Sequence, residues 1–134
     1  MMGKKVIQSE KLRRPVATYS QRIQAEDLLF RGGMTAFDQD GQLARKGDVK
    51  AKTVQVLENI KGVVEAAGGT MEDIVQTTVC VTHLPNYPCV EQMYKTYFPK
   101  DPSARATLRI DLVKPEYLVE MSATAVIEAS SKKG

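Results

Sequence analysis

Between Asp48 and Ala67 the apolar residues recur with the spacing of an α-helix. They follow the positions i, i+3, i+4 and i+7, and charged residues occupy the other side. We therefore predict a helix over 48–67 that is buried along one face and ended by Gly68 and Gly69. The apolar positions are Val56, Leu57, Ile60, Val63, Val64 and Ala67, and the predicted polar face carries Lys52, Glu58, Lys61 and Glu65.

Segments typical of β-strands lie on both sides of this helix. We predict short strands over 14–20 and 27–33 before it, and a second helix, 87–98, after it. Three further strands are predicted over 74–82, 104–112 and 118–127. With one further strand before the first helix, to which no bounds are assigned, the order becomes β, β, β, α, β, α, β, β. This order predicts an α+β fold with a six-stranded mixed sheet and two helices on one face.

Length and charge restrict the classes of function. The 134 residues predict a single domain, 1–134, with frayed ends at about 1–4 and 129–134. The net charge of +3 comes from interspersed residues without a basic run, so no nucleic-acid partner is expected. No apolar run has the length of a membrane span or a signal peptide, so we expect no membrane partner and a cytoplasmic protein.

Residues that commonly bind metals are scarce. Cys80 and Cys89 do not have the spacing of a metal or redox site, and we expect both to be free thiols. His83 is the single histidine, which excludes histidine-rich zinc sites and argues against a catalytic Ser-His or Cys-His pair. The sequence therefore predicts no metal site.

The strand predicted over 104–112 carries arginines at polar positions. Its even positions and the odd positions of 118–127 are apolar, and we expect both apolar faces to pack on the core. The polar face with Arg105, Thr107 and Glu120 is then left uncovered. Such a mixed face favours a symmetric oligomer in which these faces pack together.

An antiparallel pairing of these two strands would set their register. A short connection near Leu112 places Arg105 directly opposite Glu120. The same register places Arg109 opposite Glu116, as in an ordinary cross-strand ion pair. A slip of two residues keeps the faces and changes the partners.

A series of motifs covers the chain from about Arg14 to Ile127. They are TYSQ, VLENIKGVVEAAGGTMEDIVQTTVCVT, MYKTYF, SARATL and VEMSATAV. Their order and spacing resemble the reactive-intermediate deaminase family, the Rid or YjgF-type proteins. The segments AGGTMEDI, YFPKDPSAR and LVKPEYLVE look closest to the RutC branch of that family.

The resemblance implies a fold, an assembly and an activity. The fold would be the chorismate-mutase-like, YjgF-type α+β fold, assembled as a homotrimer with a central barrel and with sites at the subunit interfaces. Family members hydrolyse 2-imino acids, the tautomers of enamines such as 2-aminoacrylate, to a 2-keto acid and ammonia without metal or cofactor. The expected partner is therefore a small carboxylated imine or enamine.

The resemblance also assigns roles to residues. Arg105 would hold the substrate carboxylate, and Glu120 would position the hydrolytic water. Tyr19 matches a tyrosine that lines the pocket from a neighbouring subunit, and the position of Thr107 supplies backbone contacts. Gly33 matches the glycine of a substrate-binding Ser-Gly-Gln segment. The chemistry agrees, since a guanidinium binds a carboxylate bidentately and an electrophilic imine needs little beyond a positioned water.

Three departures from the family bear on the substrate. Thr107 replaces a common cysteine, Glu91 replaces a frequent asparagine, and Gly32 replaces the pocket serine. Glu91 either reaches the cleft or lies on an exposed helix face. Arg109 is either half of an ion pair or a second clamp for a dicarboxylate.

Other functions remain open at this point. One is a pathway-specific deaminase of a dicarboxylate enamine such as 2-aminomuconate. Another is a non-catalytic, small-molecule-binding or chaperone-like protein, which would need the arginine but not Glu120. A third is a ribonuclease, as some family members have been described, although the modest charge argues against it.

Overall fold

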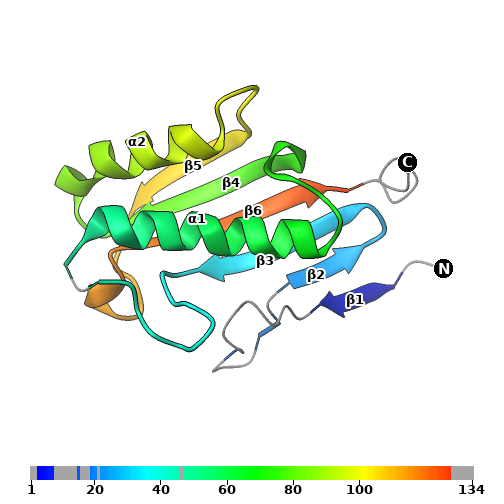
Figure 1. Ribbon diagram of the computed structural model, residues 1–134, viewed down its shortest axis with the longest axis horizontal. Coiled ribbons are helices and arrows are strands. Elements are labelled where there is room, and N and C mark those ends of the chain that lie inside the picture. Colours follow the sequence, from blue (N-terminus) through cyan, green and yellow to red (C-terminus); the bar gives the residue numbers. More distant parts are fainter. Residues whose placement is uncertain (1–2, 8–14, 16–18, 21, 46, 128–134) are drawn as a thin grey trace.

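The computed structural model describes residues 3–7, 15, 19–20, 22–45 and 47–127 (Figure 1). Their order confirms the predicted succession of strands and helices. The elements are β1 Lys4–Ile7, β2 Arg22–Ala25, β3 Leu28–Met34, α1 Val49–Ala66, β4 Ile74–Val81, α2 Tyr87–Tyr97, β5 Ala104–Arg109 and β6 Val119–Val126. Three short 3-10 helices join them, η1 Met71–Asp73, η2 Leu84–Asn86 and η3 Pro115–Tyr117.

The N-terminal strands differ from the prediction. Most of the strand expected over 14–20 lies outside the described residues, and Pro15, Tyr19 and Ser20 are not in a strand. Lys4, expected at a frayed end, instead begins β1 and pairs with Ala25 of β2.

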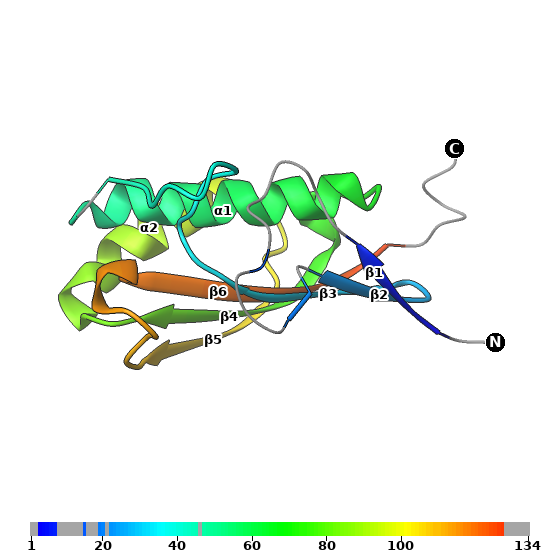
Figure 2. The ribbon, with the colours of Figure 1, turned by 90° about the horizontal axis from the view of Figure 1, so that it is seen from below.

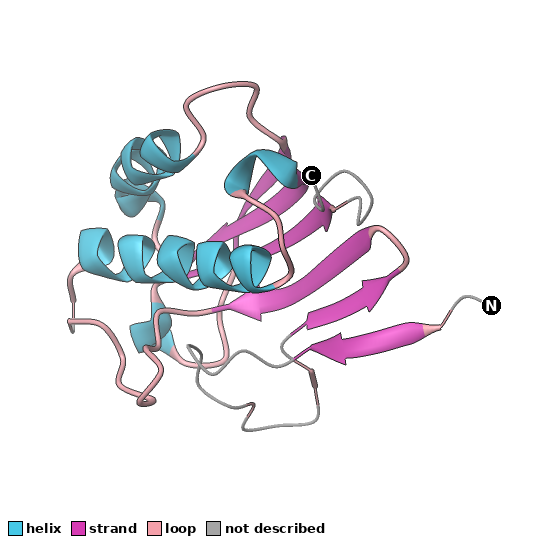
Figure 3. Cartoon of the chain, turned by 45° about the vertical axis from the view of Figure 1, so that its right-hand side comes forward, coloured by secondary structure: helices cyan, strands magenta, loops and turns pink. Residues whose placement is uncertain are grey.

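The strands form one mixed sheet with the order β1-β2-β3-β6-β4-β5. β4 and β5 are parallel, and the other neighbouring pairs are antiparallel. Figure 2 shows both helices on one side of the sheet, and Figure 3 shows the strands side by side beneath them. The prediction of a six-stranded mixed sheet with two helices on one face is confirmed.

The predicted pairing of the last two strands is wrong, because β4 lies between β5 and β6. Arg105 pairs with Thr77 of β4, and Glu120 pairs with Cys80 of the same strand. The physical reason is the helical connection from β4 to β5. A parallel neighbour needs such a crossover, which places β5 at the sheet edge and leaves the other side of β4 for β6.

The predicted face of β5 is wrong as well. Thr77 is buried under α2, and cross-strand partners share a face, so Arg105 points to the helix side. The apolar even positions of β5, such as Leu108, therefore lie on the open face of the sheet together with Glu120. For β6 the prediction holds, since Val119, Met121, Ala123 and Ala125 are buried.

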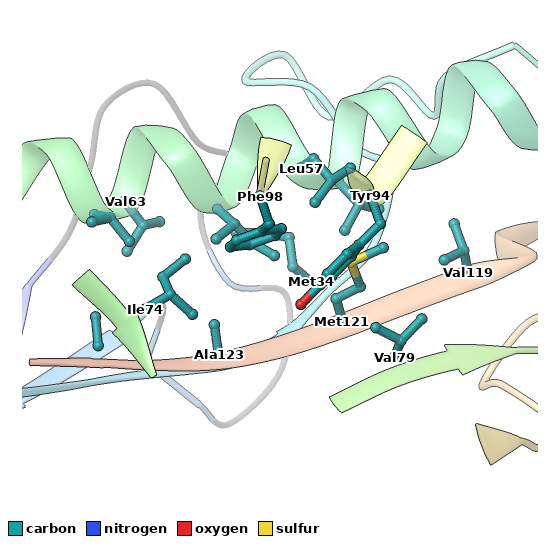
Figure 4. Packing of buried hydrophobic residues seen from close by; sticks show 14 of the residues in the cluster. Met34, Leu57, Val63, Ile74, Val79, Tyr94, Phe98, Val119, Met121 and Ala123 are labelled. Atoms are coloured by element: carbon teal, nitrogen blue, oxygen red, sulfur yellow. The ribbon is translucent and has the colours of Figure 1, made fainter. Parts of the chain in front are cut away.

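The core lies between the two helices and the sheet (Figure 4). Tyr94 and Phe98 of α2 stack with ring centroids 4.4 Å apart, and Figure 4 shows both rings between α1 and β6. Asp48 caps α1, since its Oδ1 accepts a hydrogen bond of 2.9 Å from the Ala51 N–H. The buried side chains of Val90, Tyr94 and Phe98 pack α2, the helix that faces Arg105, onto this core.

Lys52, expected on the polar face of α1, is fully buried. Its Nζ donates a hydrogen bond of 2.8 Å to the carbonyl oxygen of Ala44, which ties the preceding loop to the helix. Burial lowers the pKa of this amine, while the charges of Glu116 and Asp48 raise it. Hydropathy alone cannot show this, because a lysine is buried only where a specific acceptor meets its amine.

Candidate active site

Arg105 reaches from the edge strand β5 to the side of α2. Its NH1 lies 2.7 Å from Oε1 of Glu91, and its NH2 donates a hydrogen bond of 2.8 Å to the hydroxyl of Tyr87. The Arg105 side chain is 22% exposed and that of Glu91 34% exposed, so the pair is partly shielded from water. The guanidinium is therefore held in one place before any ligand arrives.

The helix positions these partners through its repeat. Tyr87, Glu91 and Tyr94 follow the spacing i, i+4, i+7 and so face the same side. The Arg105 Cζ lies 4.7 Å from the centre of the Tyr94 ring, within the range of a cation–π contact. The Tyr94 hydroxyl is in turn 2.7 Å from the hydroxyl of Thr77 on β4.

The charge of Arg105 is stable in this environment. Burial lowers the pKa of the guanidinium, but the hydrogen bond and the negative charge of Glu91 raise it more, so the net shift is upward. The raised pKa keeps Arg105 in its cationic form.

A pocket of about 460 Å³ opens beside the guanidinium, between α2 and the segment that leads into β5. We call it the α2 pocket. Its wall combines aromatic and proline side chains with two cations and one anion. The lining residues are Glu91, Tyr94, Lys95, Phe98, Pro99, Pro102, Ser103 and Arg105. A small organic ion could contact a charged and an apolar group here at the same time.

Glu120 lies on the open face of the sheet, over Gly33. A Cβ atom placed on Gly33 would be 2.6 Å from Oε2 of Glu120 and 2.9 Å from its Cδ. The glycine thus leaves the space that the carboxylate occupies, which brings together two of the predicted site residues. Burial raises the pKa of the neighbouring Cys80 thiol, and the charge of Glu120 raises it further.

Arg105 and Glu120 therefore project from opposite faces of the sheet, and they do not meet within one chain. We call the first group, Arg105 with Glu91 and Tyr87, the arginine half-site. The second group, Glu120 with Gly33, is the glutamate half-site. The direct pairing of Arg105 with Glu120 across two neighbouring strands, which the sequence predicted, is therefore wrong.

The other predicted residues lie around the arginine half-site or apart from it. Thr107 follows Arg105 on the same face and pairs with Val79. Arg109 is four residues along the strand from Arg105, about 13 Å at the usual rise, and it does not line the α2 pocket. Its predicted partner Glu116 lies in η3 outside the sheet, so that cross-strand ion pair is wrong.

Tyr19 is exposed and lies just before β2. Tyr87, which bonds to Arg105, and Lys95 and Ser103, which line the α2 pocket, were not among the site residues predicted from the sequence. The spacing of Tyr87, Glu91 and Lys95 indicates that they share one face of the helix. It does not show that this face lies next to Arg105, which depends on the position of β5 beside α2.

Two further observations concern the described part of the chain. Among residues 3–7, 15, 19–20, 22–45 and 47–127, no three His, Cys, Asp or Glu side chains are grouped to hold a metal ion. Within the same ranges, no helix combines the length and the apolar character that crossing a membrane requires.

Comparison with known proteins identifies the family. The family described as Endoribonuclease L-PSP matches residues 10–127. A Rid protein from Yersinia pestis, YyfA, is 32% identical, with a TM-score of 0.86 over 93% of this chain and 100% of its own. RidA from Psychrobacter sp. PAMC 21119 is 31% identical, with a TM-score of 0.85 over 92% of this chain and 99% of its own.

A more distant structure carries a ligand. TdcF of E. coli, solved with bound serine, is 25% identical, with a TM-score of 0.85 over 91% of this chain and 98% of its own. The fold that these proteins share is the one described above, and the family match covers both half-sites. The chain therefore belongs to the Endoribonuclease L-PSP family, the Rid or YjgF-type proteins.

Proposed function

We propose that this protein hydrolyses the C=N bond of a small 2-imino acid and releases a 2-keto acid and ammonia. The observation that carries the proposal is the Arg105 guanidinium, fixed by two partners at the wall of the α2 pocket. A fixed guanidinium binds a carboxylate in a defined orientation. The imine carbon next to that carboxylate is then held in place for attack.

Glu120 is the proposed base. It draws a proton from a bound water while the water oxygen forms a bond to the imine carbon, and the C=N electron pair moves to the nitrogen. The nitrogen takes up this proton from Glu120 and a second one from solvent, which gives a carbinolamine with an ammonium leaving group. As its hydroxyl gives a proton back to the Glu120 carboxylate and the C–O double bond forms, the C–N bond breaks and ammonia leaves. The reaction consumes one water and needs no oxidant or reductant.

This chemistry requires the two half-sites to come from different copies of the chain, because Arg105 and Glu120 lie on opposite faces of one sheet. The open face supports such an assembly. It exposes Leu28, Phe30 and Leu108, large apolar side chains that a neighbouring copy would cover. We propose the homotrimer expected from the sequence, with three composite sites at the interfaces and Tyr19 in the pocket wall.

The comparison with TdcF supports the choice of ligand. That protein was solved with serine, an α-amino acid, and it shares this fold over 91% of the present chain. A 2-imino acid has the same α-carboxylate and differs in the bond order at the α-carbon. We therefore propose an α-carboxylated substrate of similar size.

A dicarboxylate enamine is the second candidate, and Lys95 is the observation that favours it. Lys95 lines the α2 pocket with Arg105 and could receive a second carboxylate. Arg109, first considered for this role, lies about 13 Å along the strand from Arg105 and does not line the pocket. Placement in the RutC branch and in the cytoplasm stay predictions.

The family description names an endoribonuclease, and a binding protein without catalysis is a further possibility. RNA cleavage by a positioned base needs a cationic surface for the phosphates. The chain has a net charge of only +3 from interspersed residues. Imine hydrolysis uses both half-sites and is therefore the preferred function.

The test generates 2-iminopropanoate in the cuvette from an amino-acid oxidase and follows its decay. We expect the protein to accelerate the decay over buffer, with at least a hundredfold loss in Arg105→Ala and Glu120→Gln. A decay rate equal to that in buffer would exclude this activity. An undiminished rate in Glu120→Gln would exclude Glu120 as the base. Cleavage of RNA by a protein that does not accelerate the decay of the imine would favour the ribonuclease function.

A further inference from the structure

We propose that Glu91 selects the charge state of the ligand at Arg105. It favours ligands that carry a positively charged nitrogen beside the carboxylate, and it disfavours ligands whose only charge is the carboxylate. The proposal rests on the proposed function in one respect, that Arg105 receives the substrate carboxylate. It adds a substrate class, the protonated 2-imino acid, and a residue that recognises it.

The contact between Glu91 and Arg105 is the first step. At 2.7 Å it has the length of a charge-assisted hydrogen bond, and both side chains are partly shielded from solvent. The hydroxyl of Tyr87 links the pair, because it accepts from Arg105 and donates over 3.4 Å to Glu91. The guanidinium that should attract an anion thus already carries one.

This neutralisation changes what the arginine half-site attracts. A ligand with a single carboxylate gains the attraction of Arg105 but is repelled by the Glu91 carboxylate beside it. A zwitterionic ligand avoids this penalty if its positive group lies toward Glu91. The half-site has one charge of each sign, and a zwitterion has the complementary pair.

Covalent geometry places the positive group within reach. In a 2-imino acid or an amino acid, the α-nitrogen is about 2.5 Å from the carboxyl carbon. The ligand carboxylate and Glu91 would bind the same guanidinium. The α-nitrogen of the ligand can then lie about 4–6 Å from the Glu91 carboxylate, close enough for that negative charge to stabilise a cation. A 2-keto acid places a carbonyl oxygen there, whose lone pairs the carboxylate repels.

Two consequences follow for the reaction. Glu91 favours the protonated imine, in which the carbon is more electrophilic than in the neutral imine. After hydrolysis the zwitterion has become a keto acid anion, and the attraction to Glu91 is lost. The same residue therefore strengthens the binding of substrate and weakens the binding of product.

Lys95 is the other cation of the α2 pocket, and Glu91 and Arg105 are its charged neighbours in the pocket wall. Its charge attracts the carboxylate of both kinds of ligand and repels the positive nitrogen of the zwitterion. Because Lys95 is present in wild type and in a Glu91 variant alike, the change in the ratio of the two affinities between these proteins isolates the effect of Glu91.

The experiment measures the dissociation constants of L-alanine and pyruvate by calorimetry. These unreactive ligands share the carboxylate and the methyl group and differ at the α-carbon. In wild type we expect alanine to bind more tightly. In Glu91→Gln, the preference for alanine over pyruvate should fall about tenfold or more, the effect of one partly shielded charge. Glu65→Gln on α1 removes the same charge from an exposed position and should leave the preference unchanged.

Each outcome decides the proposal. An unchanged preference for alanine in Glu91→Gln overturns the proposal. An equal gain in affinity for both ligands also overturns it, because Glu91 would then only compete with the ligand carboxylate for Arg105. Glu91→Asn provides a second variant, and circular dichroism verifies folding of both. If wild type binds neither ligand, both this inference and the proposed binding of a substrate carboxylate by Arg105 are wrong. If wild type hydrolyses 2-iminopropanoate but the preference ignores Glu91, only this inference fails.

Discussion

The carboxylate of Glu91 lies 2.7 Å from the guanidinium of Arg105, across the space between α2 and β5. An arginine at a sheet edge has many rotamers, and binding a ligand with it would cost the entropy of ordering them. Here Glu91 and the Tyr87 hydroxyl hold the side chain in advance. The arginine half-site is therefore preorganised by residues that are themselves fixed on a packed helix.

Tyr87→Phe tests the positioning of Arg105. The change removes the hydroxyl that accepts from NH2 and leaves the ring in place. We expect KM for 2-iminopropanoate to rise about tenfold, the usual value of a hydrogen bond to a charged group, with kcat less affected. Tyr97→Phe is the control, because its hydroxyl bonds to Glu58, away from Arg105. Equal KM values in wild type and Tyr87→Phe would exclude a positioning role for Tyr87.

Gly33→Ala tests the glutamate half-site. The new methyl group would lie 2.6 Å from Oε2 of Glu120, so the carboxylate has to move. We expect at least a tenfold loss of kcat in a folded protein. Gly62→Ala is the control, since beyond its own helix α1 nothing lies within 4 Å of a Cβ at that position.

A second change at the same place makes the test specific. Glu120→Asp shortens the side chain that collides with the new methyl group. The double variant Gly33→Ala/Glu120→Asp should therefore lose less activity than the sum of the two single changes. Strict additivity would contradict a direct contact between residues 33 and 120.

The titration of Cys80 reports the charge of Glu120. Burial and the Glu120 carboxylate both raise the pKa of this thiol, so it stays protonated above the usual thiol range. Glu120→Gln removes the negative charge and should lower the pKa, while burial keeps it above the ordinary value. The rate of alkylation by iodoacetamide against pH measures this in a Cys89→Ala background, because only the thiolate is the nucleophile. An upward shift, or none, would contradict the placement of Glu120 beside Cys80.

Leu108→Glu tests the assembly. Leu108 is 48% exposed on the open face, and a charge there should prevent another copy from covering it. We expect light scattering to show a trimer for wild type and a smaller species for the variant, with activity lost in parallel. Leu84→Glu is the control, because Leu84 is 57% exposed but lies in η2, which is not part of the sheet. A variant that stays trimeric would place the interface elsewhere.

The sequence predicts well those elements whose residue pattern is determined by packing within one chain. The helical repeat places α1 within a residue at each end, and the alternation in 118–127 identifies the buried side of β6. The same reasoning fails for β5. Its apolar residues face the open side of the sheet and not the core. The alternation of apolar and polar residues shows which side chains share a face, but it cannot distinguish a face buried in the core from an apolar surface.

The site is predictable to a similar extent. Family motifs point to Arg105, Glu120 and Gly33, and the latter two do lie in contact. Their arrangement on two faces was missed because the register assumed direct pairing of the last two strands. For Glu91, which replaces a frequent asparagine, the sequence left open whether it reaches the cleft or lies on an exposed helix face. Its contact with Arg105 depends on β5 lying beside α2, which is a consequence of the parallel crossover rather than of local sequence.

The most direct test of the account mixes two inactive variants. Arg105→Ala retains the glutamate half-site, and Glu120→Gln retains the arginine half-site. When both are unfolded, mixed in equal amounts and refolded together, about a quarter of the interfaces in a random closed ring should combine the two intact halves. We predict recovery of about a quarter of the wild-type rate of 2-iminopropanoate hydrolysis. A mixture as inactive as its components would contradict a site shared between subunits.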